Sequence, residues 1–225
     1  MYLIVLEQTL FRMSKFSEVA IVNKKEIANK VFVIEFKREF DFNPGQIIGI
    51  TMSPDDKPRL YSICSGNNDK HISILFNVKE DGKLTPPLAA ANIGDKIWIT
   101  KVHGKFVFNN ELAWWIATGT GIAPFHSMFK SGQNPLKLIQ GGRLKSDMYF
   151  SDEFKAMNDY VRCASQDTGD GLFEGRLTKY LNELEDIPTN INYYLCGSTN
   201  MVMDVRNLLI TRGVGFDKVI TEIYF

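Results

Sequence analysis

The sequence has 225 residues, of which 44% are hydrophobic and 23% charged, and this composition is typical of a globular protein with one large or two small domains. Lysine and arginine together number 26, as do aspartate and glutamate, so the formal net charge is zero. A neutral chain has no overall attraction for nucleic acid or an acidic surface, and no stretch reaches the roughly 20 apolar residues of a membrane span.

The cysteines and the start of the chain bear on the compartment. Cys64, Cys163 and Cys196 are widely spaced and odd in number, which argues against a disulfide framework and fits a reducing compartment. An iron–sulfur cluster normally takes about four thiolates, so we expect no built-in cluster and no other metal site. Residues 1–12 lack the features of a secretory signal, and they either precede the true start at Met13 or form an extra strand. We therefore expect a cytoplasmic protein.

Residues 1–110 consist of short apolar runs separated by turn sequences such as Asn43-Pro44-Gly45 and Glu80-Asp81-Gly82. Short strands at this spacing predict a small antiparallel barrel, with one short helix near Pro87–Ala91. The predicted strands are Val19–Val22, Val31–Phe36, Ile47–Met52, Ile72–Phe76 and Lys96–Thr100.

Residues 111–225 alternate between apolar runs and helical segments, which predicts a second domain built on a parallel sheet covered by helices. The clearest helix is expected to begin after an N-cap at Ser198 or Thr199 and to end at Gly213. The predicted strands are Ala113–Ala117, Leu136–Ile139, Tyr160–Ala164, Ile191–Leu195 and Val219–Phe225.

A glycine-rich loop joins the first of these strands to a predicted helix at Phe125–Lys130. In Thr118-Gly119-Thr120-Gly121, the glycines let the backbone turn tightly and approach a pyrophosphate at the helix N-terminus. Pro124 suits a first helical turn but stands where the common fingerprint has a third glycine. The loop predicts a dinucleotide site, and a tight turn without a ligand is the alternative.

Several motifs in order resemble those of the ferredoxin–NADP reductase family, most closely its bacterial ferredoxin (flavodoxin) members, over residues 17–225. The segment Arg59-Leu60-Tyr61-Ser62 is similar to the flavin-binding RxYS motif, and Thr118 to Pro124 is similar to the family's TGTGxAP loop. The resemblance implies a Greek-key antiparallel barrel that binds FAD, followed by an α/β domain that binds NADP or NAD. Four further matches are Phe42-Asn43-Pro44-Gly45-Gln46, Gly82-Lys83-Leu84-Thr85, Gly175-Arg176-Leu177-Thr178 and Cys196-Gly197-Ser198.

The resemblance also assigns roles around the flavin. Arg59 would pair with a phosphate, the Tyr61 ring would pack on the isoalloxazine, and the Ser62 hydroxyl would hydrogen-bond flavin N5. Thr85 would face the flavin pyrophosphate, which implies FAD rather than FMN; alternatively, Thr85 is an N-cap. Pro86 removes one amide there. Further flavin contacts implied are Leu60, Phe76, Asn77, Val78, Gly82, Leu84 and Phe225.

A second set of roles concerns the nicotinamide. Cys196 would lie beside the nicotinamide as a positioning residue, Glu222 would lie near the flavin, and the ring of Phe225 would cover the cofactors as a gate. The alternatives are a small buried hydrophobe at Cys196 and a solvated charge at Glu222. The implied dinucleotide contacts are Thr118, Gly119, Thr120, Gly121, Pro124, Arg143, Arg176 and Gly197.

The choice of dinucleotide is less strongly indicated. Arg143 and Arg176 are candidate cations for the extra phosphate of NADP, whereas Gln166 stands where the family has an arginine and Asp167 would repel a phosphate. We expect NADP, with NAD as the alternative.

Together these features predict an FAD-dependent ferredoxin/flavodoxin–NAD(P) reductase, which exchanges a hydride with NADP(H) and single electrons with a ferredoxin or flavodoxin. One alternative is a reductase component that serves an oxygenase, a haem protein or free flavin. Another is a nucleotide-binding module that has lost its flavin. The oligomeric state is open. The lysines that could face an acidic carrier are Lys24, Lys25, Lys30 and Lys37.

Overall fold

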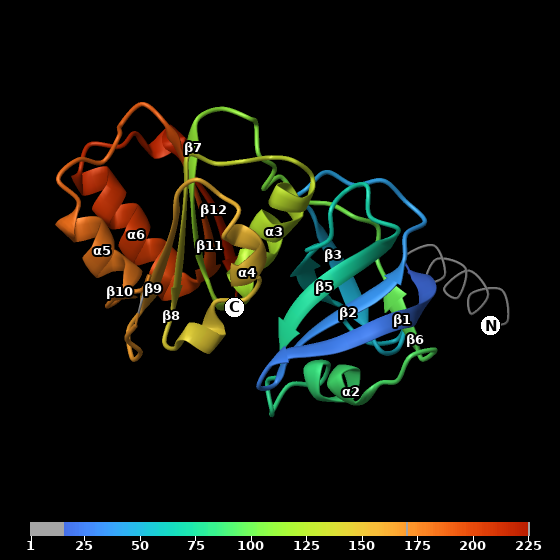
Figure 1. The fold of residues 1–225 in the computed structure, drawn as a ribbon. Coiled ribbons are helices and arrows are strands. Elements are labelled where there is room, and N and C mark those ends of the chain that lie inside the picture. The colour runs from blue at the N-terminus through green and yellow to red at the C-terminus, as the bar shows by residue number, and fades with distance from the viewer. Residues whose placement is uncertain (1–15, 170, 225) are drawn as a thin grey trace, which may run out of the picture. The chain divides into compact units, whose positions relative to one another are not determined.

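The computed structural model describes residues 16–169 and 171–224, in two compact units that divide after Val107 (Figure 1). The alternatives for residues 1–12 and the gate at Phe225 lie outside the described residues. Within the described chain, no helix is long and apolar enough to cross a membrane.

The first unit is a six-stranded antiparallel sheet in the order β4-β3-β6-β1-β2-β5. An isolated bridge between Ile63, which follows β4, and Ile74 of β5 brings the two ends of the sheet together, so the sheet curls into a barrel. The late strand β6 lies between β1 and β3, which is the crossing expected of a Greek key. The elements are β1 (Ser17–Ala28), β2 (Val31–Lys37), β3 (Ile47–Thr51), β4 (Arg59–Ser62), β5 (His71–Asn77), α2 (Thr85–Ala90) and β6 (Lys96–Ile99).

Alternating apolar residues of this sheet point inward and form its core. Ile34 and Phe36 of β2 and Ile72 and Ile74 of β5 are fully buried, and Leu88 of α2 is buried in the same cluster. The period-two alternation of a strand sends every second side chain to the same face, so the predicted strands buried their apolar residues together.

The second unit is a six-stranded parallel sheet in the order β10-β9-β8-β7-β11-β12. Helices α5 and α6 cover one face, and α3 and α4 lie on the other (Figure 1). The elements are β7 (Ala113–Thr118), η1 (Gly119–Ile122), α3 (Ala123–Lys130), β8 (Lys137–Gly142), η2 (Lys145–Asp147), α4 (Ser151–Phe154), β9 (Tyr160–Ala164), β10 (Phe173–Glu174), α5 (Leu177–Glu183), β11 (Asn192–Ser198), α6 (Thr199–Thr211), η3 (Phe216–Lys218) and β12 (Val219–Tyr224).

The expected fold class, an antiparallel barrel followed by a parallel α/β sheet, is confirmed. Ser198 is the N-cap of α6, since its hydroxyl accepts a hydrogen bond from the Met201 amide at 3.4 Å, and Gly213 follows the helix with a φ of 91°. The alternative for Thr85, an N-cap, is wrong: α2 begins at Thr85, after an N-cap at Leu84 that makes no side-chain cap bond. Helix α5 and the two-residue strand β10 were not among the predicted elements.

Candidate functional site

Strand β4 carries the Arg59-Leu60-Tyr61-Ser62 segment along an edge of the first sheet. It pairs with β3 on one side only, from Ile47 opposite Ser62 to Ile50 opposite Arg59. Arg59 is exposed and Leu60 is 57% exposed, whereas Ser62 is 2% exposed. The strand therefore presents a cation and an apolar side chain at its surface, whereas Ser62 lies inside the unit.

Tyr61 stands between this surface and the core. Its ring meets the ring of Phe76 edge-on, with centroids 6.4 Å apart, and Phe76 in turn stacks on Phe32 at 5.7 Å. Burial raises the pKa of the Tyr61 hydroxyl to about 12, against a smaller lowering by the Arg59 charge. The Tyr61 ring is thus fixed and neutral, as a flat platform for a planar ligand requires.

The remaining predicted flavin contacts lie at the end of β5 and in the loop before α2. Phe76 and Leu84 are buried in the barrel core, so only their backbone can face a ligand. Asn77 is exposed at the end of β5, and the Val78 amide donates to the Lys30 carbonyl at 2.8 Å. Lys30, which the sequence suggested only as a lysine for an acidic carrier, thereby anchors the start of this loop.

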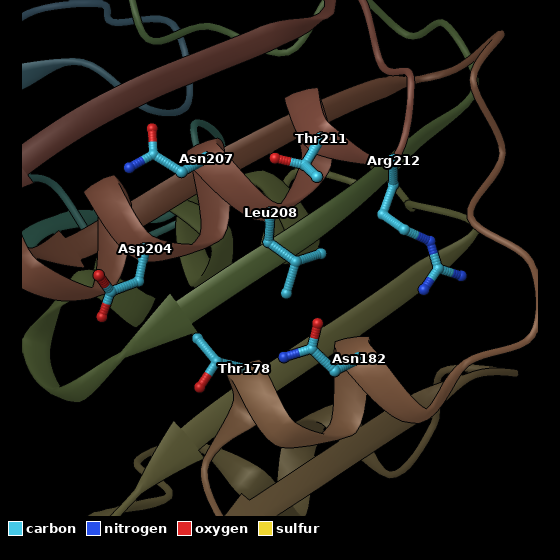
Figure 2. Close-up of a pocket in the computed structure, with 7 residues that line it drawn as sticks. All are labelled: Thr178, Asn182, Asp204, Asn207, Leu208, Thr211 and Arg212. Carbon is cyan, nitrogen blue, oxygen red and sulfur yellow. The ribbon is translucent and has the colours of Figure 1, made fainter.

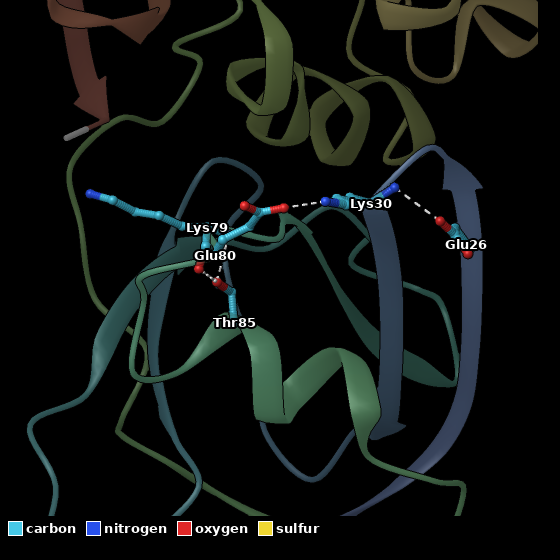
Figure 3. A network of polar contacts seen from close by, with 5 residues as sticks. All are labelled: Glu26, Lys30, Lys79, Glu80 and Thr85. Carbon is cyan, nitrogen blue, oxygen red and sulfur yellow. Dashed lines mark hydrogen bonds and ion pairs between the residues drawn. The ribbon is translucent and has the colours of Figure 1, made fainter.

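A polar network fixes the loop between β5 and α2 (Figure 3). The Thr85 hydroxyl accepts a hydrogen bond from the Lys79 amide at 2.9 Å, and the Gly82 amide donates to the Lys79 carbonyl at 2.8 Å. A Cβ on Gly82 would lie 2.8 Å from that carbonyl oxygen, so the turn requires glycine. The Lys30 ammonium pairs with Glu80. The Thr85 side chain therefore stabilises the loop through this internal hydrogen bond.

Two prolines occupy the first turn of α2. Pro86 and Pro87 follow Thr85, and neither has a backbone N–H. A phosphate at this point would meet fewer amides than at an ordinary helix start. The fit to a pyrophosphate depends more on the loop and on Arg59.

The dinucleotide loop of the second unit lies at the carboxyl end of the parallel sheet. Gly119 has a φ of 54°, and a Cβ there would meet nothing within 4 Å, so a ligand can approach the backbone. A Cβ on Gly121 would overlap the Cys196 carbonyl, and one on Gly197 would overlap the Thr118 hydroxyl. The loop thus packs backbone against backbone on the end of β11. Pro124 lies in the first turn of α3, as expected.

Cys196, Glu222 and Tyr224 come together on neighbouring strands. Cys196 of β11 is fully buried and directly opposite Glu222 of β12. Burial raises the pKa of the Cys196 thiol well above its ordinary value, the Glu222 charge adds to this, and a hydrogen bond with the Tyr224 side chain opposes it. A thiol held protonated is not a nucleophile, which fits a positioning role. Tyr224 was missed, although it shares a strand face with Glu222.

The two candidate cations lie beyond the carboxyl ends of two strands: Arg143 follows β8 and Arg176 follows β10, with β9 between these strands. The segments that follow β8 and β9 remain hydrogen-bonded to each other. The Ser165 amide donates to the Gly142 carbonyl at 3.1 Å, and the Gln166 amide donates to the Arg143 carbonyl at 2.8 Å. The Gly175 amide donates to the Ala164 carbonyl at 2.7 Å, which holds the start of α5 at the same corner. Arg143 and Arg176 are both exposed there.

Three of the four lysines suggested for an acidic carrier are engaged within the first unit. Lys24 donates to the Ala89 carbonyl at 2.7 Å and also to the Ala91 carbonyl, at the end of α2. Lys30 pairs with Glu80, and Lys37 lies 3.6 Å from Glu39. Lys24 is therefore a helix cap rather than a docking charge.

A separate groove of about 360 Å³ runs between α5 and α6 (Figure 2). Polar side chains dominate its walls, and none of the predicted site residues lines it. Its lining consists of Thr178, Asn182, Asp204, Asn207, Leu208, Thr211 and Arg212. The Arg212 guanidinium donates to the Leu184 carbonyl at 2.7 Å, so one wall serves to cap α5.

Known proteins resemble this chain in sequence and in fold. Residues 115–207 match the family described as the oxidoreductase NAD-binding domain. The chain is 29% identical over 178 residues to the flavodoxin/ferredoxin–NADP reductase of Buchnera aphidicola, covering 68% of this chain and 71% of that protein. It is 25% identical over 215 residues to the toluate 1,2-dioxygenase electron transfer component of Pseudomonas putida, covering 88% of this chain but 64% of that component.

Among solved structures, a ferredoxin NADP+ reductase from Neisseria gonorrhoeae with bound FAD and NADP superposes with a TM-score of 0.85 at 20% identity, covering 94% of this chain and 99% of that one. At that identity the match establishes the fold. Together with the sequence relatives, it confirms the resemblance to the ferredoxin–NADP reductases that the motifs indicated.

Proposed function

From the premise that this chain is a relative of the ferredoxin (flavodoxin)–NADP reductases, we propose that it is an FAD-dependent oxidoreductase that exchanges a hydride with NADP(H) or NAD(H) and single electrons with a protein carrier. The observation that carries the proposal is the joint presence of the exposed Arg59 and Leu60 on β4 in one unit and a glycine loop at Gly119 and Gly121 in the other. Each fits one of the two cofactors.

We assign flavin binding to the first domain, which the sequence predicts at residues 1–110. There, Arg59 would neutralise a flavin phosphate, and Leu60 and the Tyr61 ring would cover the isoalloxazine. Ser62 would hydrogen-bond the flavin, and the loop braced by Thr85 would bound the pyrophosphate, together with Asn77, Val78 and Gly82. Bound flavin would supply the conversion between two-electron and one-electron transfer.

In the second unit, the Thr118–Gly121 loop and Pro124 would bind the dinucleotide pyrophosphate at the start of α3, where the amides and the helix dipole favour an anion. Gly197 would keep the end of β11 packed against Thr118 of the dinucleotide loop, and the protonated Cys196 thiol would position the nicotinamide. The Tyr224 side chain is hydrogen-bonded to that thiol, the Glu222 charge favours its protonated form, and Phe225 would shield the site. Arg143 and Arg176 would meet the adenosine end.

The carrier would be a ferredoxin or a flavodoxin. A reductase component for an oxygenase is the second candidate, favoured by the match to the toluate dioxygenase component, of which the chain spans 64%. Three buried free cysteines are compatible with a reducing compartment, and we assign the protein to the cytoplasm.

The test is to purify the full chain with FAD and follow the flavin absorption band. We expect a yellow protein whose flavin is bleached by NADPH or NADH and re-oxidised by a ferredoxin or flavodoxin. Re-oxidation by an oxygenase partner, with no response to either carrier, would select the second candidate. A protein that takes up no FAD would refute both.

A further inference from the structure

Three successive backbone amides at the end of β8 are already occupied by carboxylates of this chain. The Arg143 and Leu144 amides donate to Asp147 Oδ2 at 2.9 and 3.0 Å, and the Lys145 amide donates to Asp167 Oδ2 at 2.9 Å. A run of consecutive amides is a common binding site for a phosphate. Here the donors that a phosphate would use are taken by internal acids.

Hydrogen bonds hold the Asp167 carboxylate in place and favour its ionised form. Its other carboxylate oxygen accepts a hydrogen bond from the Thr168 amide at 2.9 Å. The amide hydrogen bonds, that of Lys145 first, hold the pKa of Asp167 below its usual range. The carboxylate is therefore ionised at neutral pH, and each oxygen keeps a lone pair for a further donor.

Backbone hydrogen bonds bring these acids beside the end of the second strand, where dinucleotide sites read the adenosine ribose, although neither acid directly follows that strand in the sequence. In parallel-sheet nucleotide domains, an acid after the second strand accepts hydrogen bonds from the ribose hydroxyls, whereas a cation there accommodates a 2′-phosphate. β8 is the strand after the glycine loop, and the backbone bonds from Ser165 and Gln166 hold Asp167 beside its end. Arg143 and Arg176 contribute opposing positive charge at this corner.

We propose that Asp147 and Asp167 determine the dinucleotide preference, by occupying the amides of residues 143–145 and by repelling a 2′-phosphate, so that the protein uses NADH in preference to NADPH. This proposal rests on the proposed function, since it specifies the donor bound at that same site. Ribose hydroxyls are donors and suit these carboxylates, whereas a phosphate is an acceptor and an anion, and it suits neither.

The test measures binding of two adenosine fragments to the full chain by calorimetry, which requires no flavin turnover. We expect the wild-type protein to bind 5′-AMP at least as tightly as adenosine 2′,5′-bisphosphate. Asp167→Asn, which keeps an acceptor for the Lys145 amide, should improve the affinity for the bisphosphate relative to AMP by roughly tenfold. Asp186→Asn is the matched control, because it removes one exposed carboxylate outside this corner and should leave the ratio unchanged.

A second variant shows whether an effect of Asp167→Asn comes from the lost charge or from a disturbed loop. Gln166→Arg adds a cation and leaves both carboxylates and their amide bonds in place, and it should also raise the relative affinity for the bisphosphate. The proposal is overturned if wild-type protein binds the bisphosphate roughly tenfold or more tightly than AMP, or if both variants leave the ratio unchanged. A protein that binds no FAD but shows the expected ratio would refute the proposed function while supporting this inference.

Discussion

Gly121 lies against the backbone of Cys196, so that a Cβ on the glycine would overlap the Cys196 carbonyl group. This contact joins the dinucleotide loop to the strand that carries the buried thiol, and it makes the two motifs one structural unit.

Replacing Gly121 with alanine should therefore damage both folding and binding. Overpacking against a backbone that cannot move away costs about 1–3 kcal/mol, and the loop would be displaced from its strand. Chemical denaturation would measure the free energy of unfolding, and titration with a dinucleotide the affinity. Gly119→Ala is the comparison, since a Cβ there meets nothing within 4 Å and the cost is limited to the left-handed backbone, about 1–2 kcal/mol. A Gly121→Ala protein that is as stable as the wild type would contradict the overlap at Gly121.

Arg59→Ala should weaken FAD binding by about one to two orders of magnitude, because a charge-assisted hydrogen bond to a phosphate contributes about 1.5–3 kcal/mol. Recovery of flavin fluorescence on release gives the dissociation constant. Lys57→Ala removes an equally exposed cation two residues earlier and should change the constant little. If the two variants lose affinity alike, the effect belongs to general charge and not to Arg59.

Thr85→Ala should loosen the loop between β5 and α2, since the hydroxyl supports the Lys79 amide at 2.9 Å (Figure 3). We expect a loss of about 1 kcal/mol in unfolding free energy and weaker FAD binding. Thr85→Ser keeps the hydroxyl and should restore most of both. A serine variant as weak as the alanine variant would show that the methyl group, not the hydrogen bond, matters.

Stability should fall in alkaline solution through Cys163. Burial raises the pKa of its thiol from 9.0 to about 12. Above the lower value the unfolded chain releases the proton while the folded chain keeps it, so the free energy of unfolding decreases with rising pH, by up to about 1.4 kcal/mol per pH unit from this group. The decrease continues until the folded thiol itself ionises.

Denaturation at several pH values across this window checks that prediction. Cys163→Ala leaves a small cavity and lowers stability throughout, but it should make the pH slope less steep by the contribution of this one group, with the remaining slope due to other buried groups such as Cys196. Ile139→Val, a truncation in the neighbouring strand β8, should lower stability and keep the slope of the wild type. An unchanged slope in the cysteine variant would mean that the folded thiol titrates normally.

Motifs with a local physical meaning were predictable from the sequence. The Gly119 and Gly121 loop lies at the carboxyl end of β7, and Ser198 caps α6, because strand, turn and cap preferences act over a few residues. The short elements were not predictable in the same way. Strand β10 has two residues, too few to show a strand pattern, and it is a strand because it pairs with β9.

Contacts that depend on the register of paired strands could not be predicted from the sequence either. The bond from the Lys145 amide to Asp167 joins residues 22 positions apart, and it exists because β8 and β9 are aligned from Leu138 opposite Tyr160. Thr85 could be assigned as a cap or a ligand contact from its neighbours, yet its partner, Lys79, is set by a turn whose shape depends on the barrel.

The corner that gathers Arg143, Asp167 and Arg176 is held by main-chain hydrogen bonds from residues 165, 166 and 175. Those bonds do not depend on which side chains the residues carry. Natural variation or directed evolution can therefore exchange the side chains of residues 166 and 176 without rebuilding the sheet, so the charge of this corner can change between lineages while the architecture stays constant.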